Sequence, residues 1–419
     1  MIKKFFKKIL LFIPLVKKYT AYTRQNKNIL AENKRLQELI KNSRSPGLFD
    51  SPDDFLTERL LAHPAKNPLP SVNLSSQKAV DGLNRAVIAD RLIKSYHKAL
   101  EDEKYSLFRQ EGEDLWTDLV RNELPELMET IDQKDPEKLG HYLMEFGQSF
   151  VWFGGITTCV DGYNRNLDPR QVALTYWDKL VCLAECLGVV QFENPENGPW
   201  GDILHFNMDE LLYGIEQEIG IDISLPLGII YTDGLKIGDR LFHYRHINSL
   251  YSAIRIARLN CHGDAVCEFG GGLGMTAVYA RRLGFVDYTI FDLPITCLLA
   301  GHYLMHAVGE ASVCLYGETA TEGSIKVLPY WECAVMPDNS FGLTVNQDSF
   351  PEISDNLISQ YLLHIKRSTK NYFLSINHEC FYPRTVRKFT KDSGGYEPVY
   401  RSKCWVREGY LEEVFRISK

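Results

Sequence analysis

Residues 264–275 read DAVCEFGGGLGM, an apolar run that ends in Glu268 and is followed by glycine at four of five positions. A short apolar run bounded by glycines is typical of a buried strand. A glycine-rich loop lets the backbone approach a ligand closely, and Glu268 places a negative charge beside that loop. The sequence therefore predicts a ligand site where the chain leaves this strand.

After residue 264 the apolar pattern alternates between short strand-like runs and longer helical runs. The expected strands cover 265–269, 288–291, 312–316, 341–345 and 372–376, and the expected helices cover 276–283, 296–308 and 356–365. Gly284 and Gly309 stand where two of these helices would end. This alternation predicts an α/β fold with a doubly wound, Rossmann-like parallel sheet, and residues 403–417 around Gly409 predict a closing antiparallel hairpin.

The glycines fit two different binding patterns. Gly270, Gly272 and Gly274 give the E-x-G-x-G-x-G spacing used for S-adenosylmethionine. Gly272, Gly274 and Ala277 also satisfy G-x-G-x-x-[G/A], the dinucleotide fingerprint, and Asp292 follows at the expected distance. Spacing alone leaves both cofactors open, together with a structural glycine turn that binds nothing.

Charge separates these alternatives. A dinucleotide would bring a pyrophosphate to this loop, where Glu268 would repel it in a partly desolvated site. S-adenosylmethionine instead carries an ammonium and a sulfonium, which Glu268 would attract. Asp292 can accept hydrogen bonds from ribose hydroxyls in either case. We therefore expect S-adenosylmethionine as the cofactor.

Five stretches of the chain are similar to a known enzyme family: HYRHINSLY (243–251), VCEFGGGLGMTA (266–277), FDLP (291–294), VLPYWEC (327–333) and FGLTVNQDSFPEI (341–353). Through them residues 236 to about 380 resemble the class I methyltransferases, and more closely the bacterial sugar O-methyltransferases linked with surface-polysaccharide synthesis. The segment NQDSFPEI favours the sugar group. Where such proteins often have isoleucine this chain has Phe269, which leaves the charges unchanged.

The cofactor contacts are expected along the loops that carry this resemblance and along the helix that precedes the glycine strand. The predicted cofactor-binding residues are Tyr244, Arg245, Glu268, Gly270, Gly272, Gly274, Asp292, Leu293 and Asn346. Arg245 is the expected partner of the methionyl carboxylate.

Methyl transfer requires the acceptor oxygen to lose a proton as it attacks, so the enzyme must position a base. In this fold the acceptor approaches the loop after the fourth strand, here 346–352, and the end of the fifth strand. Asp348, Glu352 and His378 are therefore the candidate general bases. Each has a structural alternative: Asp348 as a helix cap, Glu352 as a partner of the helix dipole, and His378 as a satisfied strand-end residue.

Two further ligands are considered near the acceptor loop. Its two carboxylates suit Mg²⁺ bound to a sugar diol, but the sequence gives no third ligand, so a divalent metal stays open. Arg384, Arg387, Lys388 and Lys391 form a basic cluster. This cluster is either a solvated loop or a grip on the phosphate of a nucleotide- or lipid-linked sugar.

Composition and pattern divide the chain into four parts. Residues 1–42 form a basic amphipathic and coiled-coil helix, 43–77 a proline-rich linker, 78–235 a mainly α-helical domain and 236–419 the methyltransferase domain. The helical domain is expected to cover the acceptor.

The first forty residues predict two kinds of helix. Residues 2–18 place apolar residues on one side of a helix and lysines on the other, which is typical of a helix in a membrane interface, although a helix packed on its own protein remains an alternative. We expect residues 1–20 to bind the inner membrane surface. Heptad-spaced residues over 22–40 predict a short coiled coil and a homo-oligomer, with a solvated helical stalk as the alternative.

Composition limits the classes of function. No apolar run approaches the ~20 residues that span a bilayer, and ten scattered cysteines without a C-x-x-C motif are typical of reduced thiols in the cytoplasm. The net charge is −7 and no basic stripe runs along the chain after the N-terminal lysines, which disfavours nucleic acid. We expect a cytoplasmic protein that is peripheral to the cytoplasmic face of the inner membrane.

These observations predict an S-adenosylmethionine-dependent O-methyltransferase that acts on a sugar hydroxyl of a nucleotide- or lipid-linked glycan in cell-surface polysaccharide synthesis. Two alternatives come from other classes. One is a non-catalytic methyltransferase-fold scaffold of a membrane biosynthetic complex, which would bind the cofactor without transferring methyl groups. The other is an NAD-dependent oxidoreductase, which the charge of Glu268 disfavours.

Overall fold

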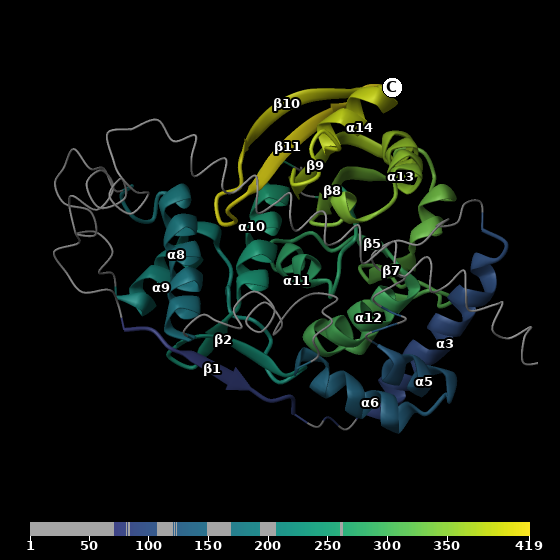
Figure 1. Ribbon diagram of the computed structural model, residues 1–419, viewed down its shortest axis with the longest axis horizontal. Coiled ribbons are helices and arrows are strands. Elements are labelled where there is room, and N and C mark those ends of the chain that lie inside the picture. Colours follow the sequence, from purple (N-terminus) through teal and green to yellow (C-terminus); the bar gives the residue numbers. More distant parts are fainter. Residues whose placement is uncertain are drawn as a thin grey trace, which may run out of the picture. The chain divides into compact units, whose positions relative to one another are not determined.

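The computed structural model describes residues 71–80, 82, 84–106, 120, 122, 124–148, 169–192, 207–259 and 263–419, all of which belong to one compact unit (Figure 1). The expected membrane helix over 1–20, the coiled coil over 22–40 and most of the linker lie outside the described residues. These three expectations therefore stay predictions.

An eight-stranded sheet forms the centre of the described chain, in the order β10-β11-β9-β8-β4-β5-β7-β6. The strands are β4 (Val266–Phe269), β5 (Tyr288–Asp292), β6 (Val313–Leu315), β7 (Ile325–Pro329), β8 (Phe341–Gln347), β9 (Thr369–His378), β10 (Tyr396–Lys403) and β11 (Tyr410–Ile417). Neighbouring strands from β6 through β9 are parallel, whereas β11 is antiparallel to both β9 and β10. The doubly wound sheet and the closing hairpin confirm the predicted fold class.

Two details of the sheet differ from the sequence expectation. The sequence pattern does not predict β7, because Lys326 and Pro329 interrupt its short apolar run. Strand β10 begins at Tyr396, well before the expected start at 403, because most of its side chains are exposed and give no apolar signal.

Helices cover both faces of the sheet, and each face has its own hydrophobic cluster. Val266 packs with α10 (Tyr244–Leu259), α11 (Met275–Arg282) and α12 (Pro294–Val308). Cys267 and Phe269 pack with α13 (Asp355–Ser368) on the other face. Successive side chains of a strand alternate between faces, so Glu268 points to the same face as Val266, toward α10 and α11.

The residues before the main sheet are mainly helical. The helices are α3 (Arg85–Glu103), α5 (Pro125–Asp132), α6 (Pro136–Glu145), α8 (Pro169–Leu187) and α9 (Met208–Ile219). Helix α3 packs against α12, and α8 packs against α10. A three-stranded antiparallel sheet joins β1 (Leu74–Gln77), β2 (Thr232–Ile237) and β3 (Arg240–Phe242). The predicted boundary at residue 235 falls inside β2, and β1 comes from the end of the predicted linker. The four-part division stays a prediction.

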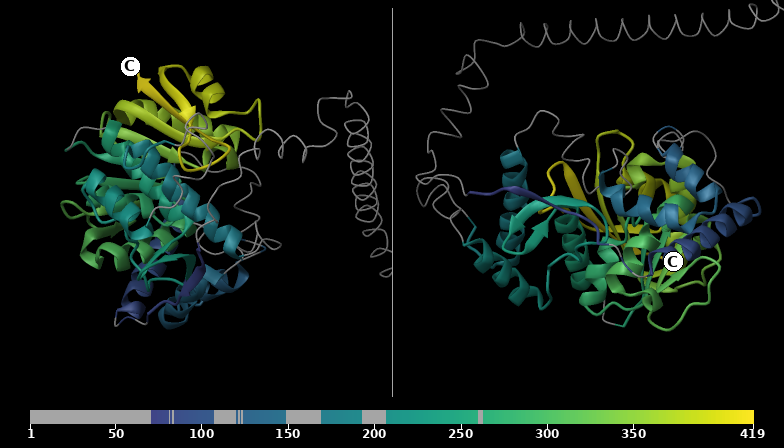
Figure 2. Two further views of the ribbon diagram at one scale, coloured as in Figure 1. Left: turned by 90° about the vertical axis from the view of Figure 1, so that its left-hand side faces the viewer. Right: turned by 90° about the horizontal axis from the view of Figure 1, so that it is seen from below.

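Strand β10 is an edge strand of the large sheet (Figure 1), and Figure 2 shows the C-terminal hairpin in yellow from two further sides. Its register against β11 shifts between Pro398 and Tyr400, and most of its side chains are exposed. Pro398 has no backbone N–H to offer a neighbouring strand, and Arg401 and Lys403 add charge. This edge is therefore poorly suited to pairing with another chain.

Candidate active site

The glycine loop lies at the point where the sheet changes direction. Strand β4 has β5 on one side and β8 on the other, so the loops that leave β4 and β8 separate at the carboxyl edge (Figure 1). In open α/β sheets, ligands bind in this crevice. Gly270, Gly272 and Gly274 have φ values of 73°, 57° and 78°, which favour glycine, and a Cβ on Gly270 would lie 2.3 Å from the Oγ of Ser349. The backbone of the loop is therefore fixed in a shape that other residues cannot adopt.

Glu268 is buried directly under this loop. It is 2% exposed, and its Oε2 lies 3.2 Å from the Cβ position of Gly271. Tyr288 donates to the same oxygen at 2.8 Å, and the Thr276 hydroxyl also donates to the carboxylate. Burial raises the pKa of Glu268 to about 7, because these two neutral donors offset only part of the cost of desolvation. No cationic side chain in the described part of the chain forms an ion pair with it.

Asp292 connects the end of β5 to the glycine loop. Its Oδ2 accepts from the Gly272 N–H at 3.0 Å, and its Oδ1 accepts from the Leu293 N–H at 2.7 Å. Burial raises the pKa of Asp292 to about 7, although these backbone donors favour the charged form. Glu268, which is buried, and Asp292, which is half-buried, thus both still require positive or hydrogen-bond-donating partners to ionise fully.

Asp348 lies at the centre of a cluster of cationic and aromatic side chains. Its Oδ2 accepts from Arg245 at 2.9 Å and from Arg407 at 2.7 Å, and its Oδ1 accepts from the Tyr410 hydroxyl at 2.5 Å. Burial opposes its ionisation, but Arg407 and Arg245 outweigh that effect and hold the pKa of Asp348 below its ordinary value. The Tyr244 hydroxyl accepts from Arg245 Nε at 2.7 Å.

This geometry changes the expected role of Asp348. The residue has a left-handed φ of 55° and is ion-paired, so it does not cap a helix, and Ser354 caps α13 instead. A carboxylate with a lowered pKa is a weaker base, so Asp348 serves better as a fixed negative charge. Arg245, expected beside the methionyl carboxylate, donates to Asp348, and its assignment to the cofactor stays a prediction.

Arg407 and Tyr410 belong to the site although no sequence motif marks them. They come from the turn and second strand of the β10–β11 hairpin, and the Arg407 guanidinium lies 3.5 Å from the centre of the Tyr410 ring. Lys179 of α8 holds this turn by donating to the Val406 carbonyl at 2.6 Å. The hairpin therefore positions a cation over the acceptor loop.

The three candidate bases come together. One ligand atom each of Asp348, Glu352 and His378 lies within 4.8 Å of the others. His378 ends β9, and its ring packs against Tyr410 at a centroid distance of 5.4 Å. Burial lowers the pKa of His378 below its ordinary value, Asp348 raises it and Arg407 lowers it, so the imidazole is neutral at pH 7. Its Nδ1 accepts from the Cys380 N–H at 3.4 Å.

The same three side chains have the composition of a divalent-metal site, and His378 is the third ligand that the sequence did not reveal. The Asp348 carboxylate, however, already accepts three hydrogen bonds, two of them from guanidinium groups. A divalent cation there would meet both positive charges. The cluster therefore fits proton transfer better than metal binding.

Asn346 ties three strands together at their carboxyl ends. Its Nδ2 donates to the Phe269 carbonyl at 2.9 Å and to the Ser349 hydroxyl, and its Oδ1 accepts from Asn377 at 2.8 Å. These bonds use its side-chain amide within the protein, so Asn346 supports the glycine loop from below. Its cofactor contact stays a prediction.

Three of the four residues in the basic cluster after β9 are paired within the protein. Arg384 donates to Asp355 at 2.5 Å, Arg387 pairs with Glu413, and Lys388 pairs with Asp392. A grip on phosphate by these three side chains would require breaking those pairs. The phosphate-binding interpretation of the cluster is therefore not supported by this geometry.

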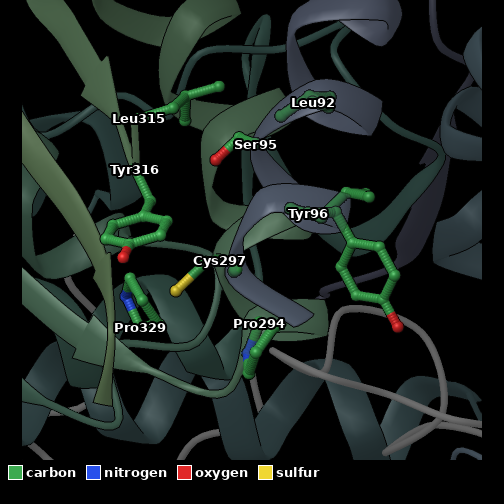
Figure 3. A pocket seen from close by; sticks show the side chains of 10 residues that line it. Leu92, Ser95, Tyr96, Pro294, Cys297, Leu315, Tyr316 and Pro329 are labelled. Atoms are coloured by element: carbon green, nitrogen blue, oxygen red, sulfur yellow. The ribbon is translucent and has the colours of Figure 1, made fainter. Parts of the chain in front are cut away.

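A small cavity lies beside the first turn of α12. It has a volume of ≈ 10 Å³ and is lined by α3, α12 and the ends of β6 and β7, including Tyr96, Cys297 and Tyr316 (Figure 3). This volume holds about one water molecule. The cavity is therefore no substrate site.

No family model and no curated protein matches the chain. Among solved structures, mitomycin 7-O-methyltransferase MmcR is similar at 15% identity, with 42% of this chain and 56% of that chain covered and a TM-score of 0.32. Geranyl diphosphate C-methyltransferase from Streptomyces coelicolor A3(2) is similar at 8% identity, with 42% of this chain and 80% of that chain covered and a TM-score of 0.33. The [4+2]-cyclase SpnF is similar at 12% identity, with 40% of this chain and 80% of that chain covered and a TM-score of 0.31. These matches include methyltransferases of different substrate classes, and at such low identity the reaction has to be argued from this chain's own residues.

Proposed function

We propose that this chain is an S-adenosylmethionine-dependent O-methyltransferase that acts on a sugar hydroxyl of a nucleotide- or lipid-linked glycan. One observation carries the proposal. The buried carboxyl group of Glu268 lies under a left-handed glycine turn at the carboxyl edge of a doubly wound sheet. Among the residues that the structure describes, no cationic side chain forms an ion pair with it. A positively charged ligand explains that arrangement, and a pyrophosphate does not.

The residues present fit this cofactor. Glu268 would face its positively charged end, the glycine turn would admit it closely, and Asp292 would accept from its ribose hydroxyls. The bound cofactor would supply an activated methyl group, which is transferred to an attacking oxygen as the bond to the sulfur breaks and the thioether leaves. The remaining work, which is to orient the acceptor and receive its proton, belongs to the protein.

His378 is the proposed proton acceptor. It is neutral at pH 7, and it is held beside Asp348 and Glu352 at the end of β9. Asp348, fixed by Arg245 and Arg407, would stabilise the positive charge that forms on the imidazole. A sugar hydroxyl is far less acidic than imidazolium, so the proton moves to His378 during methyl transfer and not before it.

The sugar acceptor and the membrane location are supported by the sequence. The segment NQDSFPEI resembles sugar O-methyltransferases, and the basic amphipathic helix predicted over 1–20 suits a glycan made at the inner membrane surface. We place the protein at the cytoplasmic face of that membrane.

Calorimetry tests the cofactor assignment. S-adenosylmethionine or its demethylated product should bind to the full chain, and Asp292→Ala should abolish the binding. Glu268 and Asp292 each have a pKa of about 7, so each is about half protonated at pH 7. If ligand binding ionises both, we expect the two carboxyl groups to release about one proton in total. That release is measured from the difference in heat between two buffers of different ionisation enthalpy. Binding of NADH in place of S-adenosylmethionine would overturn the assignment.

A second experiment tests the acceptor. The protein is incubated with a labelled methyl donor and a cell-envelope extract, and the molecule that gains label is identified. A labelled glycan supports the proposal. Cofactor binding without label in any component would instead favour a non-catalytic scaffold.

A further inference from the structure

Two neighbouring aromatic side chains are exposed beside the candidate bases. Phe381 is 54% exposed and Tyr382 is 80% exposed. They lie in residues 379–384, which we call the aromatic loop, between the end of β9 and α14 (Val386–Ser393). Single exposed apolar residues are common, but two adjacent large rings beside a proposed active site require an explanation.

The aromatic loop is firmly held. Glu379 at its start accepts two hydrogen bonds from Arg401 of β10, at 3.1 and 2.9 Å. Arg384 at its end donates to Asp355 at 2.5 Å, to the Pro351 carbonyl at 2.6 Å and to the Ile353 carbonyl.

Two turns complete the loop: the Tyr382 N–H donates to the Glu379 carbonyl at 3.1 Å, and the Arg384 N–H donates to the Phe381 carbonyl at 2.9 Å. The exposure of the two rings is therefore not the result of a loosely held segment.

The anchors also bring the Phe381 ring to a candidate base. The centre of the Phe381 ring lies 5.8 Å from the centre of the His378 ring. Arg384 binds the carbonyls on either side of Glu352, at the 3₁₀ turn Phe350–Glu352. The basic residue that seemed suited to a phosphate thus fixes the aromatic loop against the acceptor loop.

We propose that Phe381 and Tyr382 form a stacking platform for the acceptor glycosyl ring, an inference that rests on the proposed function. A pyranose has an apolar face of C–H groups and a rim of hydroxyls. The apolar face fits an aromatic ring, and the rim fits the nearby carboxylates of Glu352 and Glu379. A rigid platform of this kind orients one hydroxyl toward His378 without ordering a flexible loop on binding.

Charge favours a sugar over a lipid surface as the occupant. Glu379 is paired with Arg401, and Glu352 adds a further carboxylate at the neighbouring turn, so the loop presents no net positive charge to anionic head groups. Its one cation, Arg384, is paired with Asp355. The platform therefore combines apolar rings with hydrogen-bond acceptors, as a neutral polyhydroxyl ligand requires.

Saturation-transfer NMR on the full chain tests the platform without requiring methyl transfer. The probes are methyl α- and β-hexopyranosides. Wild-type protein should transfer saturation to the ring C–H protons, and Phe381→Ala combined with Tyr382→Ala should weaken binding at least ~10-fold. Tyr213→Ala on α9 is the matched control, because Tyr213 is 61% exposed and belongs to a different element. It should bind as the wild type does.

The outcomes separate the platform from the cofactor assignment. Asp292→Ala should keep pyranoside binding while losing S-adenosylmethionine binding. If the wild type binds pyranosides but no methyl donor, the proposed function fails and the platform stands. The platform is overturned if the wild type contacts no pyranoside, or if the double variant contacts pyranosides as well as the wild type does. If the double variant loses binding to phosphatidylglycerol vesicles while its pyranoside binding is unchanged, the two rings would be reassigned to membrane contact.

Discussion

Glu268 is a residue whose burial works against folding. Its pKa of about 7 means that the folded protein disfavours its charge, at a cost of roughly 3 kcal/mol when it is fully ionised. A cationic neighbour within the protein would offset this cost of ionisation. The burial of Glu268 is therefore best explained by a ligand that supplies the cation.

Glu268→Gln should separate binding from stability. The amide keeps the size of the side chain but removes its charge, so we expect S-adenosylmethionine affinity to fall at least ~10-fold. The folded-state pKa lies above the unfolded value, so wild-type stability is lost as the pH rises through about 7. The variant should therefore be more stable than the wild type at pH 8 by on the order of 1–3 kcal/mol, and equal to it near pH 4.5. Calorimetry and chemical denaturation measure the two effects.

Glu332→Gln is a matched control. Burial and the nearby Asp102 of α3 raise the pKa of Glu332 as well, but it lies in the 3₁₀ turn Tyr330–Ala334 and is none of the predicted cofactor-binding residues. It should leave cofactor affinity unchanged. Equal affinity of wild type and Glu268→Gln would remove the charge argument.

His378 and Asp348 should respond differently to substitution. His378→Ala should lower turnover at least ~10²-fold while cofactor affinity stays near that of the wild type. Asp348→Asn should in addition destabilise the fold, because Arg245 and Arg407 would lose their shared partner. Burial lowers the pKa of His378, so the wild-type rate should fall with decreasing pH only below the ordinary range of histidine. Single-turnover rates and unfolding curves distinguish the two.

Glu352→Ala completes this series. Full activity of Glu352→Ala with an inactive His378→Ala would assign the proton to the imidazole. Full activity of all three variants would show that the base lies elsewhere.

At the scale of elements, the closing hairpin depends on one buried ion pair. Arg255 of α10 donates from two nitrogens to Glu412 of β11, at 2.9 and 2.7 Å, and Tyr251 donates to the same carboxylate. Trp405 covers the guanidinium, whose centre lies 5.1 Å from the ring centre. This network fixes the hairpin that carries Arg407 toward Asp348.

Arg255→Ala should therefore destabilise the protein by about 3–5 kcal/mol, because it leaves the buried Glu412 charge without its partner. Urea denaturation measures the change. Arg258→Ala is the control: Arg258 also lies over Trp405 but is exposed, and it should cost less than about 1 kcal/mol. Similar losses in both variants would contradict a special role for the buried pair.

The elements also show what a sequence reveals and what it conceals. The glycine loop and its neighbouring strands were predictable because apolar runs, glycines and Asp292 follow one another closely along the chain. Arg407 was not, because it meets Asp348 only after the hairpin folds back across β9. Arg384 was misleading for the opposite reason: its basic neighbours are visible in the sequence, but Asp355 and the carbonyl partners are brought to it only by packing.

For the whole molecule, the membrane association predicted from residues 1–20 can be tested separately from the candidate active site. In the described part of the chain no helix is long and apolar enough to span a bilayer. Deleting residues 1–20 should move the protein from the membrane pellet to the supernatant, because it removes the basic amphipathic face. Fractionation followed by immunoblotting measures this.

The same deletion variant should still bind S-adenosylmethionine, which serves as its folding control. Unchanged sedimentation of the deletion variant would assign the basic helix to packing on its own protein.

The edge of the large sheet has a consequence for crowding at such a surface. With Pro398 and a register shift in β10, one copy cannot easily extend its sheet into the next through this edge. Copies that gather on a membrane surface would therefore not join their sheets through β10. Any ordered assembly would have to begin at some other part of the chain.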